Sequence, residues 1–287
     1  FFLFFFLIQI NFTQGKGIVL CRTWDQVVAA MSGIEGGVCA QEYVSDPLLI
    51  EGHKFDLRVY ALVLSVDPLR IYLFDDGLVR MCAVKYKKPT MKGIASGFDR
   101  TSHLTNYAVN KNHADFEFNE DGHEIGSGHK RTIQWFRSWL ESQGQDSASV
   151  WTSVADVVNR TLLSVQPQLA HAYRSSIPDP EDDGFTCFEI LGFDIMFRSN
   201  YDPVLVEVNH SPSLTCDTPL DKNIKYALLR ETMKIIKGVL NVYSMFTQCL
   251  LNVYSMFFGL PLFKKLLRYL SYILCSRTLF FFLFLLL

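Results

Sequence analysis

The sequence predicts an α+β fold, in which antiparallel strands and helices occupy separate parts of the chain. Two apolar segments, residues 188–197 and 204–210, flank a short run of turn-forming residues and predict a β-hairpin. Residues 51–60 alternate strictly between polar and apolar side chains, which indicates a strand with one buried face. Residues 132–140 and 149–173 have a helical period instead. This arrangement does not match a doubly wound parallel sheet.

The chain begins with an apolar run that carries no charge. Residues 1–8 are all Phe, Leu or Ile, and they lack the basic residues and the length of a secretory signal. Similar Phe and Leu runs stand at both ends, as translation of a pyrimidine-rich noncoding sequence would give. We expect an atypical apolar leader over residues 1–10, a main folded region over residues 11–240 and an apolar helical tail over residues 241–287.

A glycine-containing segment follows the leader. Gln14, Gly15 and Gly17 belong to the sequence Gln-Gly-Lys-Gly-Ile, whose flexible backbone suits a loop that covers phosphate groups. A short Gly-x-Gly pattern is only a weak indication of such a loop by itself.

The polar face of the strand at residues 51–60 carries a row of charges. Lys54, Asp56 and Arg58 point to one side, whereas apolar residues such as Phe55 and Leu57 point to the other. Two interpretations are open. The alternating charges could pair with one another and protect an edge strand from aggregation. They could also bind a polyphosphate, because Lys offers a point charge and Arg a planar fork for phosphate oxygens.

Polar connections separate the next predicted elements. Residues 99–128 are polar and are predicted to be mostly loop. Two prolines and an acidic run make residues 175–184 a surface connection. Residues 220–240, after the hairpin, are predicted to form a closing helix.

The predicted hairpin brings acidic residues together. If Phe197 pairs with Val204, Asp194 lies opposite Glu207, and two carboxylates about 5 Å apart repel each other unless a cation lies between them. Asn209 lies on the same face as Glu207 and offers a third oxygen ligand. A few hard oxygen ligands suit Mg²⁺, which keeps water and phosphate oxygens in its shell. The alternative is a surface hairpin whose acids are solvated.

The composition fits a cytosolic enzyme. The chain has 287 residues, enough for one large or two modest domains with a substantial core. Its formal net charge of −2 gives no basic excess, so the charge does not indicate binding to nucleic acid, and attraction to acidic partners must come from local patches. Seven cysteines are scattered without a Cys-x-x-Cys pair, which indicates reduced thiols rather than a zinc site or a disulfide framework.

Four short motifs follow one another along the chain: Lys54-Phe-Asp-Leu-Arg58, Tyr72-Leu-Phe-Asp-Asp-Gly-Leu-Val-Arg80, His103-Leu-Thr-Asn-Tyr107 and Glu207-Val-Asn-His-Ser-Pro-Ser213. Together they resemble the tubulin tyrosine ligase-like family, especially its polyglutamylase branch. The resemblance runs in order from about residue 14 to about residue 237, so a chance match is improbable. It implies an ATP-grasp fold, here its central and C-terminal subdomains, with ATP held between two α+β subdomains. Residues 11–240 would be the catalytic region.

The resemblance also implies a role for individual residues. Arg58 would be catalytic and lie near the transferred phosphate. ATP would be bound by the glycine loop, by a hinge that contacts adenine and by polar strand and turn residues, namely Gln14, Gly15, Gly17, Gln41, Glu42, Tyr43, Val44, Lys54, Asp56, Thr105 and Asn106. The other implied contacts are Asp194, Glu207 and Asn209 to Mg²⁺, Arg80, Tyr107 and Lys130 to the incoming amino acid, and His210 to the acceptor chain.

Structural interpretations stand beside some of these roles. Arg80 could cap a turn at Asp75, Asp76 and Gly77, and residues 105–106 could form an ordinary turn and helix cap. Tyr107 and His210 could serve packing or contact solvent, as such side chains at strand ends usually do.

The reaction implied by the resemblance is ATP-dependent addition of glutamate to the side-chain carboxylates of glutamates in tubulin tails. ATP would activate the acceptor carboxylate as an acyl phosphate, and the amine of the free amino acid would displace the phosphate. A glutamate donor needs cations for its extra carboxylate, which Arg80 and Lys130 would supply; glycine is the alternative donor. The implied partners are ATP, Mg²⁺, free glutamate and tubulin or microtubules, without nucleic acid or membrane. The implied location is the cytoplasm and its microtubules, including cilia or basal bodies.

Ile8 departs from the family pattern, in which a lysine at this position holds the phosphates. The N-terminal part expected before it is missing as well. We therefore expect an ATP-grasp unit that is incomplete at its N-terminus, and an alternative function is a catalytically impaired fragment that binds nucleotide or tubulin.

The tail contains a short repeat and an apolar end. Residues 241–246 recur as residues 252–257, and this spacing of eleven residues is close to three helical turns, so both copies would present the same stripe of a helix. Residues 250–287 hold only four charges, so autonomous microtubule binding is not indicated. Residues 269–287 reach the length of a membrane span, and residues 263–274 could form an interfacial helix. A membrane-associated protein that reuses the fold is thus a further alternative.

Overall fold

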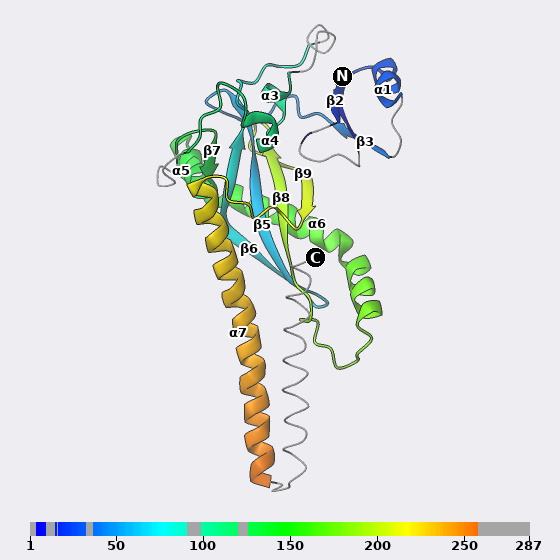
Figure 1. The fold of residues 1–287 in the computed structure, drawn as a ribbon, viewed down its shortest axis with the longest axis vertical. Helices are drawn as coiled ribbons and strands as arrows, with labels where there is room; N and C mark the ends of the chain where they lie inside the picture. Colours follow the sequence, from blue (N-terminus) through cyan, green and yellow to red (C-terminus); the bar gives the residue numbers. More distant parts are fainter. Residues whose placement is uncertain are drawn as a thin grey trace.

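The computed structural model describes residues 4–9, 15, 17–32, 37–90, 99–119 and 126–257, and for Gln9 and residues 240–257 it describes the backbone alone. The described chain forms a three-stranded sheet and a six-stranded sheet, with helices packed on the larger one (Figure 1). All paired strands are antiparallel. The predicted α+β class is confirmed.

The small sheet is built around a strand from the apolar start of the chain. Strand β1 (Phe5–Gln9) lies between β2 (Ile18–Cys21) and β3 (Val38–Glu42). Helix α1 (Trp24–Met31) connects β2 to β3 and begins with a capping box, in which the side chains of Thr23 and its partner three residues later each accept a backbone N–H. Residues within the predicted leader therefore pair with strands on both sides.

The large sheet has the strand order β7-β6-β5-β8-β9, and the short β4 pairs with β5. Strand β5 is therefore central, so the interpretation of its charges as protection for an edge strand is wrong. The strands, in chain order, are β4 (Leu49–Ile50), β5 (His53–Val66), β6 (Leu69–Met81), β7 (Lys130–Thr132), β8 (Glu189–Phe197) and β9 (Pro203–His210).

Strands β8 and β9 form the predicted hairpin with a different register at its turn. Asp194 lies opposite Glu207, as predicted. Phe197, however, pairs with Pro203 and not with Val204. An irregularity in the ladder directly after Asp194 absorbs one extra residue of β9 and restores the predicted pairing of the two acids.

The helices confirm the predicted helical segments and extend some of them. Helices α5 (Ile133–Ser142) and α6 (Ser147–Ser176) cover the two segments with helical period. Helix α7 (Pro219–Phe257) includes the predicted closing helix and continues through both copies of the repeat. The segment predicted as mostly loop holds two single-turn helices, α3 (Arg100–His103) and α4 (Tyr107–Asn110).

Successive side chains of β5 point to opposite faces of the sheet, and the two faces have different surroundings. Its apolar residues join the main core with α5 and α6, where each fully buried Leu or Phe contributes about 1.5–3 kcal/mol; this core includes Phe55, Leu57, Val59, Phe136, Leu140, Val154 and Val158. On the other face, Tyr60 packs with Leu78 and with Leu220, Ile224 and Leu228 of α7. The charged residues of β5 share this second face.

None of the helices in the described part of the chain combines the length and apolar character needed to cross a membrane. The predicted span at residues 269–287 and the predicted interfacial helix at residues 263–274 lie outside the described residues.

Candidate functional site

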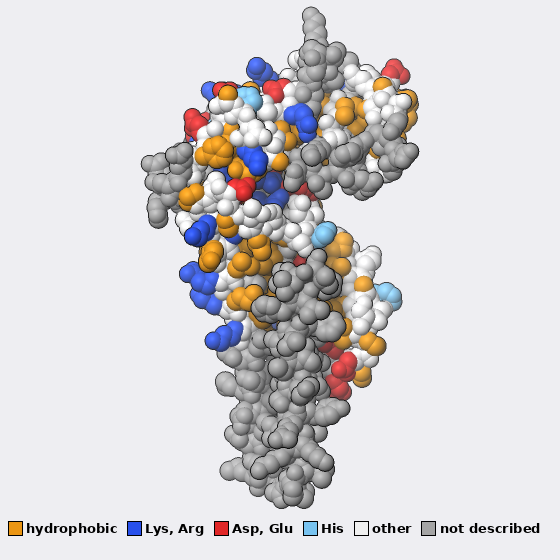
Figure 2. All heavy atoms as spheres, in the orientation of Figure 1, with side chains coloured by type: hydrophobic (Ala, Val, Ile, Leu, Met, Phe, Trp, Pro, Cys, Tyr) orange, Lys and Arg blue, Asp and Glu red, His pale blue; other side chains and the backbone are white. Residues whose placement is uncertain are grey.

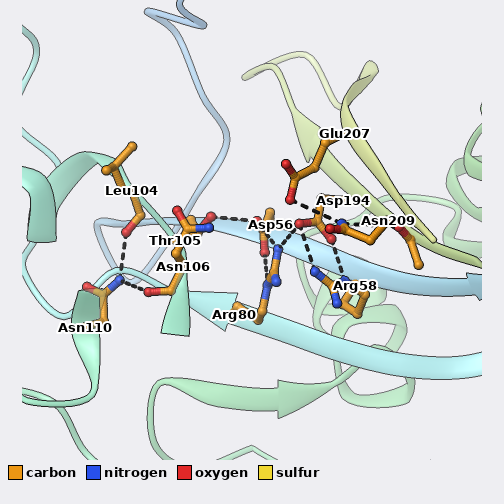
Figure 3. A network of polar contacts seen from close by, with 11 residues as sticks. Asp56, Arg58, Arg80, Leu104, Thr105, Asn106, Asn110, Asp194, Glu207 and Asn209 are labelled. Carbon is orange, nitrogen blue, oxygen red and sulfur yellow. Dashed lines mark hydrogen bonds and ion pairs between the residues drawn. The ribbon is translucent and has the colours of Figure 1, made fainter. Parts of the chain in front are cut away.

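A chain of alternating charges crosses strands β6, β5 and β8 (Figure 3), on the face of the sheet where Tyr60 packs against α7. In the strand ladders Asp56 lies opposite Arg80, and Arg58 lies opposite Asp194. Arg80 donates to both oxygens of Asp56, at 2.7 and 2.6 Å, and its Nη2 lies 2.6 Å from Asp194 Oδ2. Arg58 donates to both oxygens of Asp194, at 2.5 and 3.0 Å. Thr105 Oγ1 adds a bond of 2.6 Å to Asp56.

These ion pairs determine the protonation state of Asp194 and the role of Arg80. Although burial opposes it, Arg80 and then Arg58 hold the pKa of Asp194 at about 2, so this carboxylate is ionised at neutral pH. The interpretation of Arg80 as the cap of a turn is wrong, because residues 75–77 lie within β6 and the guanidinium reaches Asp56 and Asp194.

The three predicted metal ligands lie together on β8 and β9. Asn209 Nδ2 is 3.2 Å from Glu207 Oε1 and 3.4 Å from the carbonyl of Gly192. Partial desolvation and then the neighbouring Asp194 raise the pKa of Glu207. Glu207 has no ion pair within the described part of the chain, and the charge of Arg80 offsets this repulsion only in part.

These donors fit Mg²⁺. Carboxylate and amide oxygens are few and hard ligands, and such an ion completes its shell with water and phosphate oxygens. Both oxygens of Asp194 are bound to Arg58 and Arg80 in this structure, so Glu207 and Asn209 are the two donors of this set that line the cavity. Among the described residues, no three His, Cys, Asp or Glu side chains gather as a metal site. An ion held by these residues would share its coordination with a substrate.

A cavity of about 1040 Å³ opens beside this network. Figure 2 shows Lys and Arg side chains gathered in a hollow near the upper end of α7. Further cations of the wall were not predicted from the sequence, namely Arg100, Lys111 and Lys225. The predicted site residues that line the cavity are Arg58, Arg80, Asn106, Tyr107, Lys130, Glu207, Asn209 and His210.

Lys54 is a buried cation where the two sheets meet. Its side chain comes from β5, and its Nζ lies 4.4 Å from the ring centre of Tyr43 and 5.7 Å from that of Phe6. The residue is 2% exposed, and burial lowers the pKa of its ammonium group to about 8. No carboxylate lies within 4 Å of Lys54 Nζ among the described residues. A buried ammonium group without a counter-ion is costly, which suits a position that receives an anion.

The predicted glycine loop lies against the α3–α4 segment. Gly15 and Gly17 have positive φ angles of 78° and 66°, which favour glycine. A Cβ on Gly15 would lie 2.9 Å from Asn106 Oδ1, and Arg100 Nη2 donates to the carbonyl of Gly15. Gln14 lies outside the described residues.

The predicted adenine hinge follows the edge of the small sheet. Gln41 Nε2 donates to the carbonyl of Val206 at 3.1 Å, which ties β3 to the hairpin. Glu42 is exposed, whereas Tyr43 and Val44 are buried.

A model of the tubulin-tyrosine ligase family matches residues 9–244. The chain belongs to this family. The family resemblance and the ATP-grasp class expected from the motifs are confirmed.

Curated relatives of this family member are named as polyglutamylases. Over 223 residues, or 78% of the chain, it is 42% identical to a "Probable beta-tubulin polyglutamylase" of Tetrahymena thermophila and 40% identical to "Tubulin polyglutamylase ttll6" of Danio rerio. Over 227 residues, or 79% of the chain, it is 38% identical to "Tubulin polyglutamylase TTLL7" of Homo sapiens. These alignments cover 18%, 27% and 24% of the relatives, so the chain spans about a quarter of their length or less.

In this member of the tubulin-tyrosine ligase family, the sequence predicted one of the three charged residues that meet where α7 reaches the cavity. Lys130, which was predicted, lies 3.9 Å from the ring centre of Tyr107 and donates to Asp221 Oδ2 at 2.8 Å. Asp221 and Lys225 at the start of α7 were not predicted. The pattern Thr-x-x-Asp at residues 218–221 is a helix-start signal that could have located Asp221.

Proposed function

We propose that the chain is the ATP-dependent catalytic part of a ligase that adds glutamate to the side-chain carboxylates of glutamates in tubulin tails. The observation that carries this proposal is the cavity, whose wall holds five buried or half-buried cations beside the pair Glu207 and Asn209. Such a wall suits reactants that are all anions, namely a nucleotide and two carboxylates. The names of the relatives support tubulin as the acceptor and glutamate as the donor.

Each group of predicted site residues would have its own role in this reaction. Bound ATP would supply the phosphoryl group that converts the acceptor carboxylate to an acyl phosphate, with Mg²⁺ held by the acids of the hairpin. Lys54 would hold nucleotide phosphates, with Asp56, Thr105 and the hinge, and Arg58 would face the transferred group. The donor amine then attacks the acyl carbon, the C–O bond to phosphate breaks and an amide bond forms.

The remaining predicted residues would bind the two amino-acid partners. Arg80, Tyr107 and Lys130 line the cavity and would hold the donor. His210 is exposed at the same cavity and would contact the acceptor chain. This activity would place the protein on cytoplasmic microtubules, including those of cilia or basal bodies.

Incorporation of labelled glutamate into microtubules tests the proposal. We expect incorporation that requires Mg²⁺ and ATP and that falls roughly 100-fold or more in Glu207→Gln, because the variant loses a charged ligand of the metal. Glu189→Gln, the same change at an exposed position of β8, is the matched control and should keep full activity.

Two results would contradict the proposal. Equal incorporation by the wild type and Glu207→Gln would exclude this residue from the reaction. Stabilisation by ATP without any incorporation would indicate the alternative, a nucleotide-binding fragment that lacks ligase activity.

A further inference from the structure

Gly192 is a buried residue of β8 on the face of the sheet that carries the charged network. It stands two positions before Asp194, which places both residues on the same face, and its ladder partners are Tyr60 of β5 and Asn209 of β9. Its φ angle is not positive, so the backbone conformation does not require glycine. A glycine inside a strand weakens the strand, and it often marks a place where another group approaches closely.

Two groups occupy the space where a side chain of residue 192 would stand. A Cβ built on Gly192 would lie 3.1 Å from Arg58 Cδ and 3.4 Å from Arg58 Nε. The same Cβ would lie 3.0 Å from Pro212 Cβ. Arg58 reaches this space from the neighbouring strand β5, and Pro212 reaches it from the turn that follows β9. Because protein interiors are close-packed, even a methyl group at this position would displace one of these two residues.

The turn after β9 has a backbone conformation that few residues adopt. Ser211 has a positive φ angle of 48°, in the left-handed region that favours glycine. Such a conformation persists only where the surrounding structure fixes it. The next residue, Pro212, lies against Gly192 and lines the cavity. The turn and the glycine therefore fit each other at the wall of the site.

The side chain of Arg58 is held along its length. Its Cδ lies against Gly192, and its guanidinium donates to both oxygens of Asp194, at 2.5 and 3.0 Å (Figure 3). These two bonds use Nε and Nη2. The third nitrogen, Nη1, has no hydrogen-bond partner among the described residues, and Arg58 lines the cavity. One edge of the guanidinium is thus fixed by the protein, and Nη1 remains available to a ligand.

We propose that Gly192 is a positioning residue, whose missing side chain leaves Arg58 the room to place its guanidinium against the terminal phosphate of a bound nucleotide. This inference rests on the proposed function, in which Arg58 faces the transferred group. A misplacement of about 1 Å in an active site can cost a factor of about 100 in rate. A methyl group at position 192 is therefore large enough to disturb this contact.

Calorimetric titrations of the full chain with ADP and with a non-hydrolysable ATP analogue, both with Mg²⁺, test the inference. The two ligands differ in the terminal phosphate, so the ratio of their affinities reports the contact with this group. We expect the wild type to bind the ATP analogue at least about tenfold more tightly than ADP, since a hydrogen bond between charged groups is worth about that factor. Arg58→Met should lose this preference, and Gly192→Ala should lose it as well.

A double variant separates positioning from a general effect on the strand. Because Gly192 acts through Arg58, the variant that combines Gly192→Ala with Arg58→Met should lose no more of the preference than Arg58→Met alone. Leu191→Ala is the matched control. It weakens the same strand at the next position, but Leu191 packs against the main core on the other face of the sheet. This variant should keep the preference for the ATP analogue.

Pro212→Gly is a second variant, which keeps the inference testable if Gly192→Ala does not fold. It opens the space beside Arg58 from the other side and adds no atom. The arginine would then be held less firmly, so part of the preference should be lost.

Four results would overturn the inference. These are a wild type without preference for the ATP analogue, an unchanged preference in both Gly192→Ala and Pro212→Gly, an equal loss in Leu191→Ala, and losses that add up in the double variant. A preference that depends on Gly192 and Arg58, found together with no incorporation of glutamate into microtubules, would support this inference and contradict the proposed function.

Discussion

Lys54 and His103 are buried basic side chains whose pKa values are lowered by their surroundings. Burial lowers the pKa of Lys54 to about 8, and burial together with the charge of Lys54 lowers the pKa of His103 to about 4. His103 is therefore neutral at pH 7, and its Nδ1 shares a hydrogen bond of 2.8 Å with the Tyr43 hydroxyl. A neutral histidine avoids a second positive charge beside the lysine. At this scale, the chemistry of Lys54 depends on the protonation state of its neighbour.

We predict that the protein loses stability as the pH falls from 6.5 towards 4. In this window the unfolded chain protonates His103, whose ordinary pKa is 6.5, whereas the folded protein keeps it neutral. The stability that depends on neutral His103 is present above pH 6.5 and declines by about 3 kcal/mol as the pH approaches 4. Urea unfolding at several pH values measures this change.

Two variants separate His103 from the other groups that titrate in this window. His103→Gln should have a smaller pH slope than the wild type, whereas His171→Gln should not, because His171 is exposed. Identical slopes for the wild type and His103→Gln would show that this side chain is not the source of the pH dependence.

At the scale of elements, β6 shows how contacts between distant segments override a local pattern. Asp75, Asp76 and Gly77 were predicted as a turn, yet they lie within the strand. Asp76 Oδ1 accepts N–H groups from Gly77 at 2.8 Å and from Gln134 at 3.2 Å, so it caps the start of α5. Gly77 lies directly against the backbone of β5. Turn-forming residues serve here to join a strand to a helix.

We predict that Gly77→Ala destabilises the protein by about 1–3 kcal/mol, as overpacking of a core does. A Cβ at this position would lie 2.4 Å from the carbonyl oxygen of Arg58 and 2.7 Å from Ile133 Cδ1, so β5 and β6 would have to separate. The free energy of unfolding in urea measures the effect.

Gly238→Ala is the matched control, because a Cβ there meets nothing within 4 Å inside helix α7. It should stabilise the protein by about 0.5–1 kcal/mol, as removal of a helical glycine does. A Gly77→Ala variant as stable as the wild type would contradict the close packing of the two strands.

The parts of the site that follow a local period were predictable from the sequence. The face shared by Lys54, Asp56 and Arg58 follows from alternation along one strand, and the meeting of Asp194 with Glu207 follows from a short hairpin. Contacts between distant segments were not predictable. The contact of Arg80 with Asp194, the link from Gln41 to β9 and the cluster around Asp221 join elements that are far apart in the chain, and no local pattern encodes these contacts.

At the scale of the whole molecule, the two sheets meet over a cation. Lys54 comes from the large sheet, whereas Phe6 and Tyr43 come from the small sheet or directly follow it. The aromatic rings stabilise the ammonium group without neutralising it. The junction between the sheets thus combines a hydrophobic contact with a buried ammonium group. The buried charge lowers the stability of the fold, but it favours the binding of an anion.

We predict that Lys54→Met stabilises the protein while removing its response to ATP. Methionine fills the same space without a buried charge, so the free energy of unfolding should rise by about 1–4 kcal/mol, as seen when buried ions are replaced by apolar residues. ATP with Mg²⁺ should raise the unfolding temperature of the wild type, because a ligand that binds only the folded state stabilises it, and this increase should disappear in the variant. Lys88→Met, at an exposed position, should change neither quantity. A variant that is less stable, or that keeps the full ATP response, would show that Lys54 holds the sheets together rather than receiving a phosphate.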